Sequence, residues 1–236
     1  MNDPHIASAF DRDLESLQAS IMKMGGLVEE SILEGAEALI KRDVELANAV
    51  RGKDAAIDTL EEQINEEAAR ILALRQPMSR DLRTVLTVMR ISANLERIGD
   101  YAKNMAKRTS VLAEMSPING SDKALRRMAK EVEVMLVDVL DAYIAQDPDL
   151  AHDVRDRDQS VDQMYNALFR EFLTYMMEDP RNITACMHLH FIAKNIERMG
   201  DHVTNIAEQV IYLITGESPD DARPKSDNTS RHNPAV

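Results

Sequence analysis

The sequence is short of the residues that break helices or crosslink a chain. Its 236 residues include eight Gly, eight Pro, one Cys and no Trp, and only 4% are aromatic. Ala, Leu, Met, Glu and Arg, which lose least on entering a helix, are abundant instead. The composition therefore predicts an all-α fold. The lone Cys186 excludes an internal disulfide, fits a reducing compartment and is best interpreted as a buried free thiol.

The sequence also lacks any segment typical of a targeting signal or a membrane span. The amino-terminal stretch MNDPHIASAFDRD has neither a basic region nor an apolar core. No later stretch approaches the ~20 consecutive apolar residues that a spanning helix needs. We expect a soluble, cytoplasmic protein.

Basic residues are outnumbered. The 28 Lys and Arg against 41 Asp and Glu give a formal net charge of −13. Nucleic-acid affinity depends on basic side chains that displace counterions from phosphates, so we expect no DNA or RNA partner. The same charge repels free phosphate and anionic lipid, so any phosphate chemistry would need a bridging cation or a local basic patch.

What the sequence does contain is an internal repeat. NLERIGDYAKN at residues 94–104 returns as NIERMGDHVTN at residues 195–205, and seven of the thirteen residues in 94–106 and 195–207 are identical. The match extends upstream, where the segment at 54–58 aligns with the one at 158–162. We predict two copies of about a hundred residues each. The predicted ranges are 1–115 and 121–215, with a linker at 116–120 and a disordered tail at 216–236.

Apolar residues follow a helical period within each copy, at spacings of three and four. In the first copy the three stripes are Leu14, Leu17, Ile21, Met24 and Val28; Ile57, Leu60, Ile64, Ala68 and Ile71; and Ile91, Leu95, Ile98, Ala102 and Met105. The stripes predict three helices per copy. Gly25 and Gly26 predict a bend in the first helix. Pro148 after Asp147 predicts a helix start, and Ser121 is a candidate N-cap.

Two carboxylates and an amide share one face of the third helix in each copy, because residues at i, i+4 and i+8 point the same way. These residues are Glu96, Asp100 and Asn104, and Glu197, Asp201 and Asn205. The face lies opposite the apolar stripe, so its carboxylates are expected to point away from the core. The preceding helix adds a second acidic pair in each copy, Asp54 with Asp58 and Asp158 with Asp162. If the two helices are antiparallel neighbours, four acids converge in each copy.

Such clusters have two interpretations. Carboxylates one helical turn apart repel each other, and oxygen-rich clusters are what hard or borderline cations such as Mg, Mn, Fe or Ca require. A solvated acidic face is the alternative, because 41 acids form such pairs by chance and a duplicated domain starts out identical. Spacing alone leaves both interpretations open.

Glycine and arginine neighbours accompany the acids in both copies. Gly99 and Gly200 lie inside helices, where glycine costs roughly 1 kcal/mol relative to alanine. We expect them to permit tight packing, with close approach of a ligand as the alternative. Arg97 and Arg198 are each expected to pair with the acid three residues on, with a phosphate contact as the second possibility.

At these residues the sequence resembles the PhoU family of phosphate-signalling regulators. The resemblance covers nearly the whole chain before the tail. The matching segments are Phe10-Asp-Arg-Asp-Leu14, Met24-Gly25, Gln76-Pro77, Asp81-Leu-Arg83 and the two Glu-Arg-x-Gly-Asp phrases. The second copy departs from the first at Arg181-Asn182-Ile183-Thr184, which aligns with Arg80-Asp81-Leu82-Arg83.

The resemblance implies two tandem three-helix bundles related by a pseudo-twofold axis, with metal held on the bundle surface by paired acidic motifs. The matching ligands are Asp54, Asp58, Glu96 and Asp100, then Asp158, Asp162, Glu197 and Asp201, with Asn104, Asn205, Arg97 and Arg198 in support. The candidate metals are Fe, Mn, Mg and Zn. The resemblance also implies an adaptor between the ATPase subunit of a Pst-type phosphate transporter and a phosphate-sensing histidine kinase. It would damp phosphate-starvation signalling, and we expect a homo-oligomer, a dimer.

Two other function classes compete with a non-enzymatic regulator. A ferritin-like di-iron oxidase would need inward-facing Glu and Glu-x-x-His pairs, but no histidine here has a Glu three residues before it. A helical scaffold with solvated acidic faces survives if no metal binds. We hypothesise a regulator in which metal offsets the acidic surface and so allows contact with a partner or with phosphate.

Overall fold

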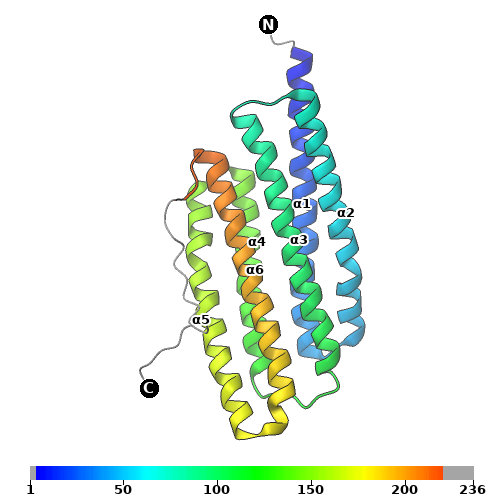
Figure 1. The fold of residues 1–236 in the computed structure, drawn as a ribbon, viewed down its shortest axis with the longest axis vertical. Coiled ribbons are helices and arrows are strands. Elements are labelled where there is room, and N and C mark those ends of the chain that lie inside the picture. Colours follow the sequence, from blue (N-terminus) through cyan, green and yellow to red (C-terminus); the bar gives the residue numbers. More distant parts are fainter. Residues whose placement is uncertain (1–3, 220–236) are drawn as a thin grey trace.

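The computed structural model describes residues 4–219, and this part of the chain folds into long helices with no strand (Figure 1). The helices are α1 (Pro4–Lys41), α2 (Val44–Arg75), α3 (Arg80–Leu112), α4 (Ser121–Ala145), α5 (Pro148–Glu178) and α6 (Ile183–Thr215), with a short 3-10 helix, η1 (Pro180–Asn182), before α6. The predicted all-α fold with three helices per copy is confirmed. Most of the predicted tail, residues 220–236, lies outside the described residues.

The two copies pack side by side along their long axes. α3 and α6 lie next to each other on one face of the molecule and run in opposite directions, while α1 and α4 are in contact behind them (Figure 1). α2 and α5 lie on the two flanks. No helix in the part of the chain that the structure describes is long and apolar enough to cross a membrane.

Buried apolar side chains from all six helices form one continuous core. The predicted stripe on α3 from Ile91 to Met105 is fully buried, and the α2 stripe from Ile57 to Ile71 is at most 7% exposed. Each apolar stripe runs along the length of its helix. Burying these stripes against one another therefore aligns the helix axes, whichever way the chain runs. The second copy buries the equivalent α6 stripe, including Ile192, Ile196 and Val203.

Equivalent turns join the first two helices of each copy, α1 to α2 and α4 to α5. Arg42 and Gln146 adopt left-handed backbone conformations after α1 and α4, with φ of 54° and 52°. Asp43 and Asp147 then cap the next helix, accepting hydrogen bonds from the backbone N–H of Leu46 (2.9 Å) and of Leu150 (3.1 Å). The predicted helix start at Asp147-Pro148 is confirmed.

The predicted cap at Ser121 is wrong. Gly120 is the N-cap, with φ of 83°, and the Ser121 hydroxyl donates back to the Ile118 carbonyl at 2.9 Å. Ile118 is itself buried, so the connection between α3 and α4 is packed against the core. The exact limits of the two copies and of the linker stay a prediction.

Gly25 and Gly26 do not interrupt α1, which is helical from Pro4 to Lys41. A Cβ atom at Gly25 would collide with the Leu140 side chain of α4, whereas nothing lies within 4 Å of one at Gly26. Gly25 therefore lets α1 and α4 approach closely at the back of the molecule.

Candidate functional site

The four predicted acids of the first copy lie along the contact between the antiparallel helices α2 and α3. Asp54 is buried and forms an ion pair with Lys103, whose ammonium also lies 3.4 Å from Asp100 Oδ1. Asp58 is exposed, and the Glu96 side chain is 23% exposed. A lysine that the sequence analysis did not consider thus joins two of the predicted ligands.

The acids of the first copy affect one another's ionisation. Burial, reinforced by the neighbouring charges of Asp54 and Asp100, raises the pKa of Asp58. Burial also raises the pKa of Glu96, and the charges of Asp100 and Asp58 act in the same direction. The hydrogen bond to Asp54 raises the pKa of Lys103. The first copy therefore holds carboxylates that repel each other around one ammonium group.

Arg97 contributes a second, exposed cation. Its guanidinium lies 3.7 Å from Asp100, as predicted, and 3.4 Å from Glu96. The pair is weak because the Arg97 side chain is 60% exposed. Asn104, one turn beyond Asp100, is exposed to solvent.

The equivalent acids of the second copy are buried. Asp158, Asp162 and Glu197 are 2%, 4% and 5% exposed, and Asp201 is half-buried. The expectation that the α6 carboxylates point away from the core is therefore wrong for Glu197. The apolar stripe of α6 does not by itself determine the burial of Glu197, because that burial also depends on how closely α5 packs against α6.

Gly200 accounts for part of this close packing. A Cβ atom there would lie 3.0 Å from the Asp158 carboxylate and 3.4 Å from Val161 on α5. At the equivalent Gly99 the nearest atom would be the end of the Ile57 side chain, also at 3.0 Å. Both glycines thus permit tight packing, as expected, but only the second places a carboxylate against the helix backbone.

The cations differ between the copies as well. Position 204, which aligns with Lys103, is a fully buried threonine whose hydroxyl donates to the Gly200 carbonyl at 2.9 Å. Lys194 pairs with Glu197 at 2.8 Å and lies over the Tyr165 ring. The second copy therefore places its lysine one turn before the acidic pair instead of one turn after it.

The predicted ion pair between Arg198 and Asp201 is wrong. The Arg198 guanidinium instead lies over the ring of Tyr101 on α3, 5.8 Å from its centroid, because α3 offers an aromatic face within reach. Asn205, the other supporting residue, donates to Asn94 of α3 at 3.4 Å. These two residues of the second copy contact the first copy.

Among residues 4–219, no three His, Cys, Asp or Glu side chains are grouped closely enough to hold a metal ion. The donor chemistry nevertheless suits hard cations, since every predicted ligand offers a carboxylate oxygen. In the first copy, Lys103 places a positive charge between two of these carboxylates.

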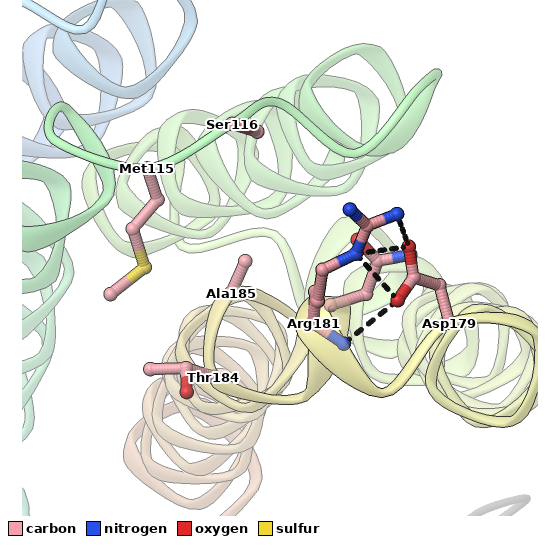
Figure 2. Close-up of a pocket in the computed structure, with 7 residues that line it drawn as sticks. Met115, Ser116, Asp179, Arg181, Thr184 and Ala185 are labelled. Atoms are coloured by element: carbon pink, nitrogen blue, oxygen red, sulfur yellow. Dashed lines mark hydrogen bonds and ion pairs between the residues drawn. The ribbon is translucent and has the colours of Figure 1, made fainter.

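A pocket of about 520 Å³ lies away from the acids, at the corner between α5 and α6 (Figure 2). Its lining includes Met115, Thr184 and Arg181, and Figure 2 shows the Arg181 side chain folded against Asp179, with an ion pair of 2.7 Å. The aligned corner of the first copy differs, because Arg80 there donates to Gln146. The structure therefore gives the two corners no common role.

Comparison with known proteins identifies the architecture. The PhoU domain matches residues 21–109 and 125–210, one match in each copy. The chain belongs to the PhoU family. Among solved structures, PhoU from Pseudomonas aeruginosa has a TM-score of 0.86 at 40% identity, covering 88% of this chain and 100% of that one. The phosphate transport system regulatory protein PhoU from Streptococcus pneumoniae has a TM-score of 0.83 at 34% identity, covering 89% and 99%.

Curated PhoU relatives match over almost the same length. A phosphate-specific transport system accessory protein PhoU homolog of Rhizobium meliloti is 47% identical over 98% of this chain and 97% of its own. A protein of the same description from Caulobacter vibrioides is 46% identical over 96% and 99%. The predicted family resemblance is therefore confirmed along the chain.

Sequence reasoning missed Lys103 and the polar contacts between the copies. Lys103 could have been found, since it lies three residues after Asp100 and such pairs meet on a helix surface. Asn94, which accepts from Asn205 at 3.4 Å and lies 2.8 Å from the His202 ring nitrogen, gives no such local signal. Its partners are more than a hundred residues away.

Proposed function

We propose that this protein is a regulatory accessory protein of a phosphate transport system. The observation that carries the proposal is its match, over nearly the whole chain, to accessory proteins of phosphate-specific transport systems. In the finer form of the proposal, it acts in the cytoplasm and links the transporter ATPase subunit to a sensor histidine kinase. It works by contact rather than catalysis and lowers phosphate-starvation signalling when phosphate is plentiful.

Complementation tests this function. In a bacterium deleted for its own PhoU, with a reporter driven by phosphate starvation, expression of this chain should restore repression at high phosphate. The chain should also co-purify with the transporter ATPase subunit and with the kinase cytoplasmic region. A reporter that stays active, although the chain is expressed and soluble, would contradict the proposal.

We further propose that the paired acids bind divalent or trivalent metal, with Fe, Mn, Mg or Zn as candidates. The raised pKa of Asp58 and Glu96 supports this, because carboxylates that destabilise each other when ionised gain most from a cation. Asp54, Asp58, Glu96 and Asp100 would hold it in the first copy. Asp158, Asp162, Glu197 and Asp201 would hold it in the second.

Metal content by mass spectrometry tests this second proposal. Untagged wild type, incubated with each metal and desalted, should retain metal that is lost on combining Glu96→Gln, Asp100→Asn, Glu197→Gln and Asp201→Asn. Helicity by circular dichroism should be retained in that variant. Absence of metal from both proteins would favour the alternative, a helical scaffold whose acidic faces are solvated. The dimer stays a prediction, which sedimentation velocity can check.

A further inference from the structure

The helices α3 and α6 run side by side on one face of the molecule (Figure 1). Arginines of both helices lie along the seam between them. Three of them lie over an aromatic ring of the opposite helix. The pairs, with distances from guanidinium carbon to ring centroid, are Arg90 over Tyr212 (5.9 Å), Arg108 over Phe191 (4.2 Å) and Arg198 over Tyr101 (5.8 Å). Each pair crosses the boundary between the two copies.

These three arginines have no acidic partner among residues 4–219. Arg90 donates to the Gln209 amide oxygen at 3.0 Å, and Arg108 lies 3.5 Å from a ring nitrogen of His188. A guanidinium has five N–H donors, so most of its donors remain available on each arginine. Stacking on a ring fixes the guanidinium plane without neutralising its charge.

The seam as a whole is free of acids. Spacings of four and three along each helix define twelve seam positions, and the two helices match at an offset of 101. The positions are Arg90, Asn94, Arg97, Tyr101, Asn104 and Arg108 on α3, and Phe191, Asn195, Arg198, His202, Asn205 and Gln209 on α6. Four arginines and no carboxylate occupy these twelve positions in a chain whose net charge is −13. One of the four, Arg97, pairs with Glu96 and Asp100 beside the seam, and the other three have no acidic partner among residues 4–219. The seam is therefore a local basic surface with the two acid clusters on its flanks.

We propose that this seam binds an acidic α-helix of a partner protein. Arg90 and Arg108 are about 27 Å apart along α3, and Arg198 lies between them at the level of Tyr101. This length suits an elongated ligand rather than a single small anion. Along α3, Arg90, the Tyr101 position that Arg198 covers, and Arg108 are 0, 11 and 18 residues from Arg90. Carboxylates at i, i+11 and i+18 of a partner helix fall within about 20° of one another, on one face.

Flanking charge favours a helix with one acidic face over nucleic acid. Asp100 and Asp201 lie about 80° around their helices from the centre of the seam, on its flanks, so a ligand that is anionic on every side would be repelled. A helix whose remaining faces are neutral avoids that repulsion. The inference goes beyond the proposed transport role and needs neither metal nor a particular partner.

The test uses a fluorescein-labelled, alanine-rich helical peptide of about 22 residues with glutamates confined to one face. The full-length wild type should bind it, and added salt should weaken binding. The triple variant Arg90→Gln, Arg108→Gln and Arg198→Gln should bind at least about tenfold more weakly, since each exposed charge pair contributes a small factor. The matched control variant, Arg51→Gln, Arg126→Gln and Arg127→Gln, removes three exposed arginines elsewhere and should stay within about twofold.

Circular dichroism of both variants shows whether the fold is retained. A peptide of the same composition, with its glutamates spread around the helix, should bind more weakly than the one-faced peptide. Equal loss of binding in the two variants, or no binding by wild type, would overturn the proposal. The proposal would also be overturned if a single-stranded oligonucleotide or an anionic lipid vesicle bound through these arginines and the peptide did not bind.

Discussion

The two acid clusters have one sequence pattern and two environments. In the first copy, Asp58 and Glu96 are accessible to solvent and Lys103 lies between Asp54 and Asp100. In the second copy, the three acids at 158, 162 and 197 are at most 5% exposed, and a buried threonine occupies the position of Lys103. A duplicated motif has thus kept its spacing while its depth and its counter-ion have changed.

This difference separates what helix geometry dictates from what packing decides. The i, i+4 spacing places two carboxylates on one face of a helix, whatever surrounds it. Their exposure depends on the neighbouring helix, and therefore on residues such as Gly200 that set the interhelical distance. A pattern in the sequence predicts the face, and the contacts across it determine the chemistry.

The largest expected effect on stability is the difference between alanine substitutions at the two equivalent glycines, Gly200 and Gly99. Gly200→Ala should lower the free energy of unfolding by about 1–2 kcal/mol, although alanine favours a helix by about 1 kcal/mol, because the buried Asp158 and Val161 have little room to move. Gly99→Ala should change it by less than about 0.5 kcal/mol, since the Ile57 side chain can shift its end at a small cost that roughly offsets the same helix gain. Urea unfolding measures both values. Equal values for the two would show that the α2 and α5 contacts do not differ.

A smaller effect is expected at Lys103, which has no counterpart in the second copy. Lys103→Ala should cost about 1 kcal/mol at pH 7, discounted because its side chain is 41% exposed. Its pKa is raised by Asp54, so this stability is fully present below the unfolded value of 10.5 and is lost as the pH rises through the folded value. Urea unfolding at pH 7 and above pH 11 measures the change, with the exposed Lys107→Ala as control. A loss that persists at the higher pH would contradict the ion-pair account.

The smallest effect has the opposite sign. Glu96→Gln should stabilise the metal-free protein by about 0.5 kcal/mol at pH 7, because burial and nearby acids make the ionised form unfavourable. A raised pKa contributes stability below the unfolded value of 4.5 that is lost as the pH rises, so the gain should vanish near pH 4. Thermal unfolding at both pH values, with chelator present, is the measurement. Destabilisation at pH 7 would mean that Glu96 makes a favourable contact as a carboxylate.

Much of the fold could be predicted from the sequence, because the apolar period of each helix is a local property. The α3 stripe from Ile91 to Met105 and the cap at Asp147 follow from neighbouring residues alone. The cap predicted at Ser121 is wrong because Gly120, in a left-handed conformation, occupies the cap position. For the candidate site, the spacing identified the acids but not their burial. Contacts such as Tyr101 with Arg198 join the two copies, and no local pattern specifies them.

We expect the first acid cluster to bind a cation, with the Lys103 ammonium competing against the metal for Asp54 and Asp100. The direct measurement is calorimetric titration of Mn²⁺ into metal-free wild type, Lys103→Ala and the double variant Glu96→Gln with Asp100→Asn. Removing the competing charge should strengthen Mn²⁺ binding by about threefold or more, and removing the two carboxylates should abolish binding at this copy. A Lys103→Ala titration that superimposes on that of wild type would show that the ammonium does not compete with metal.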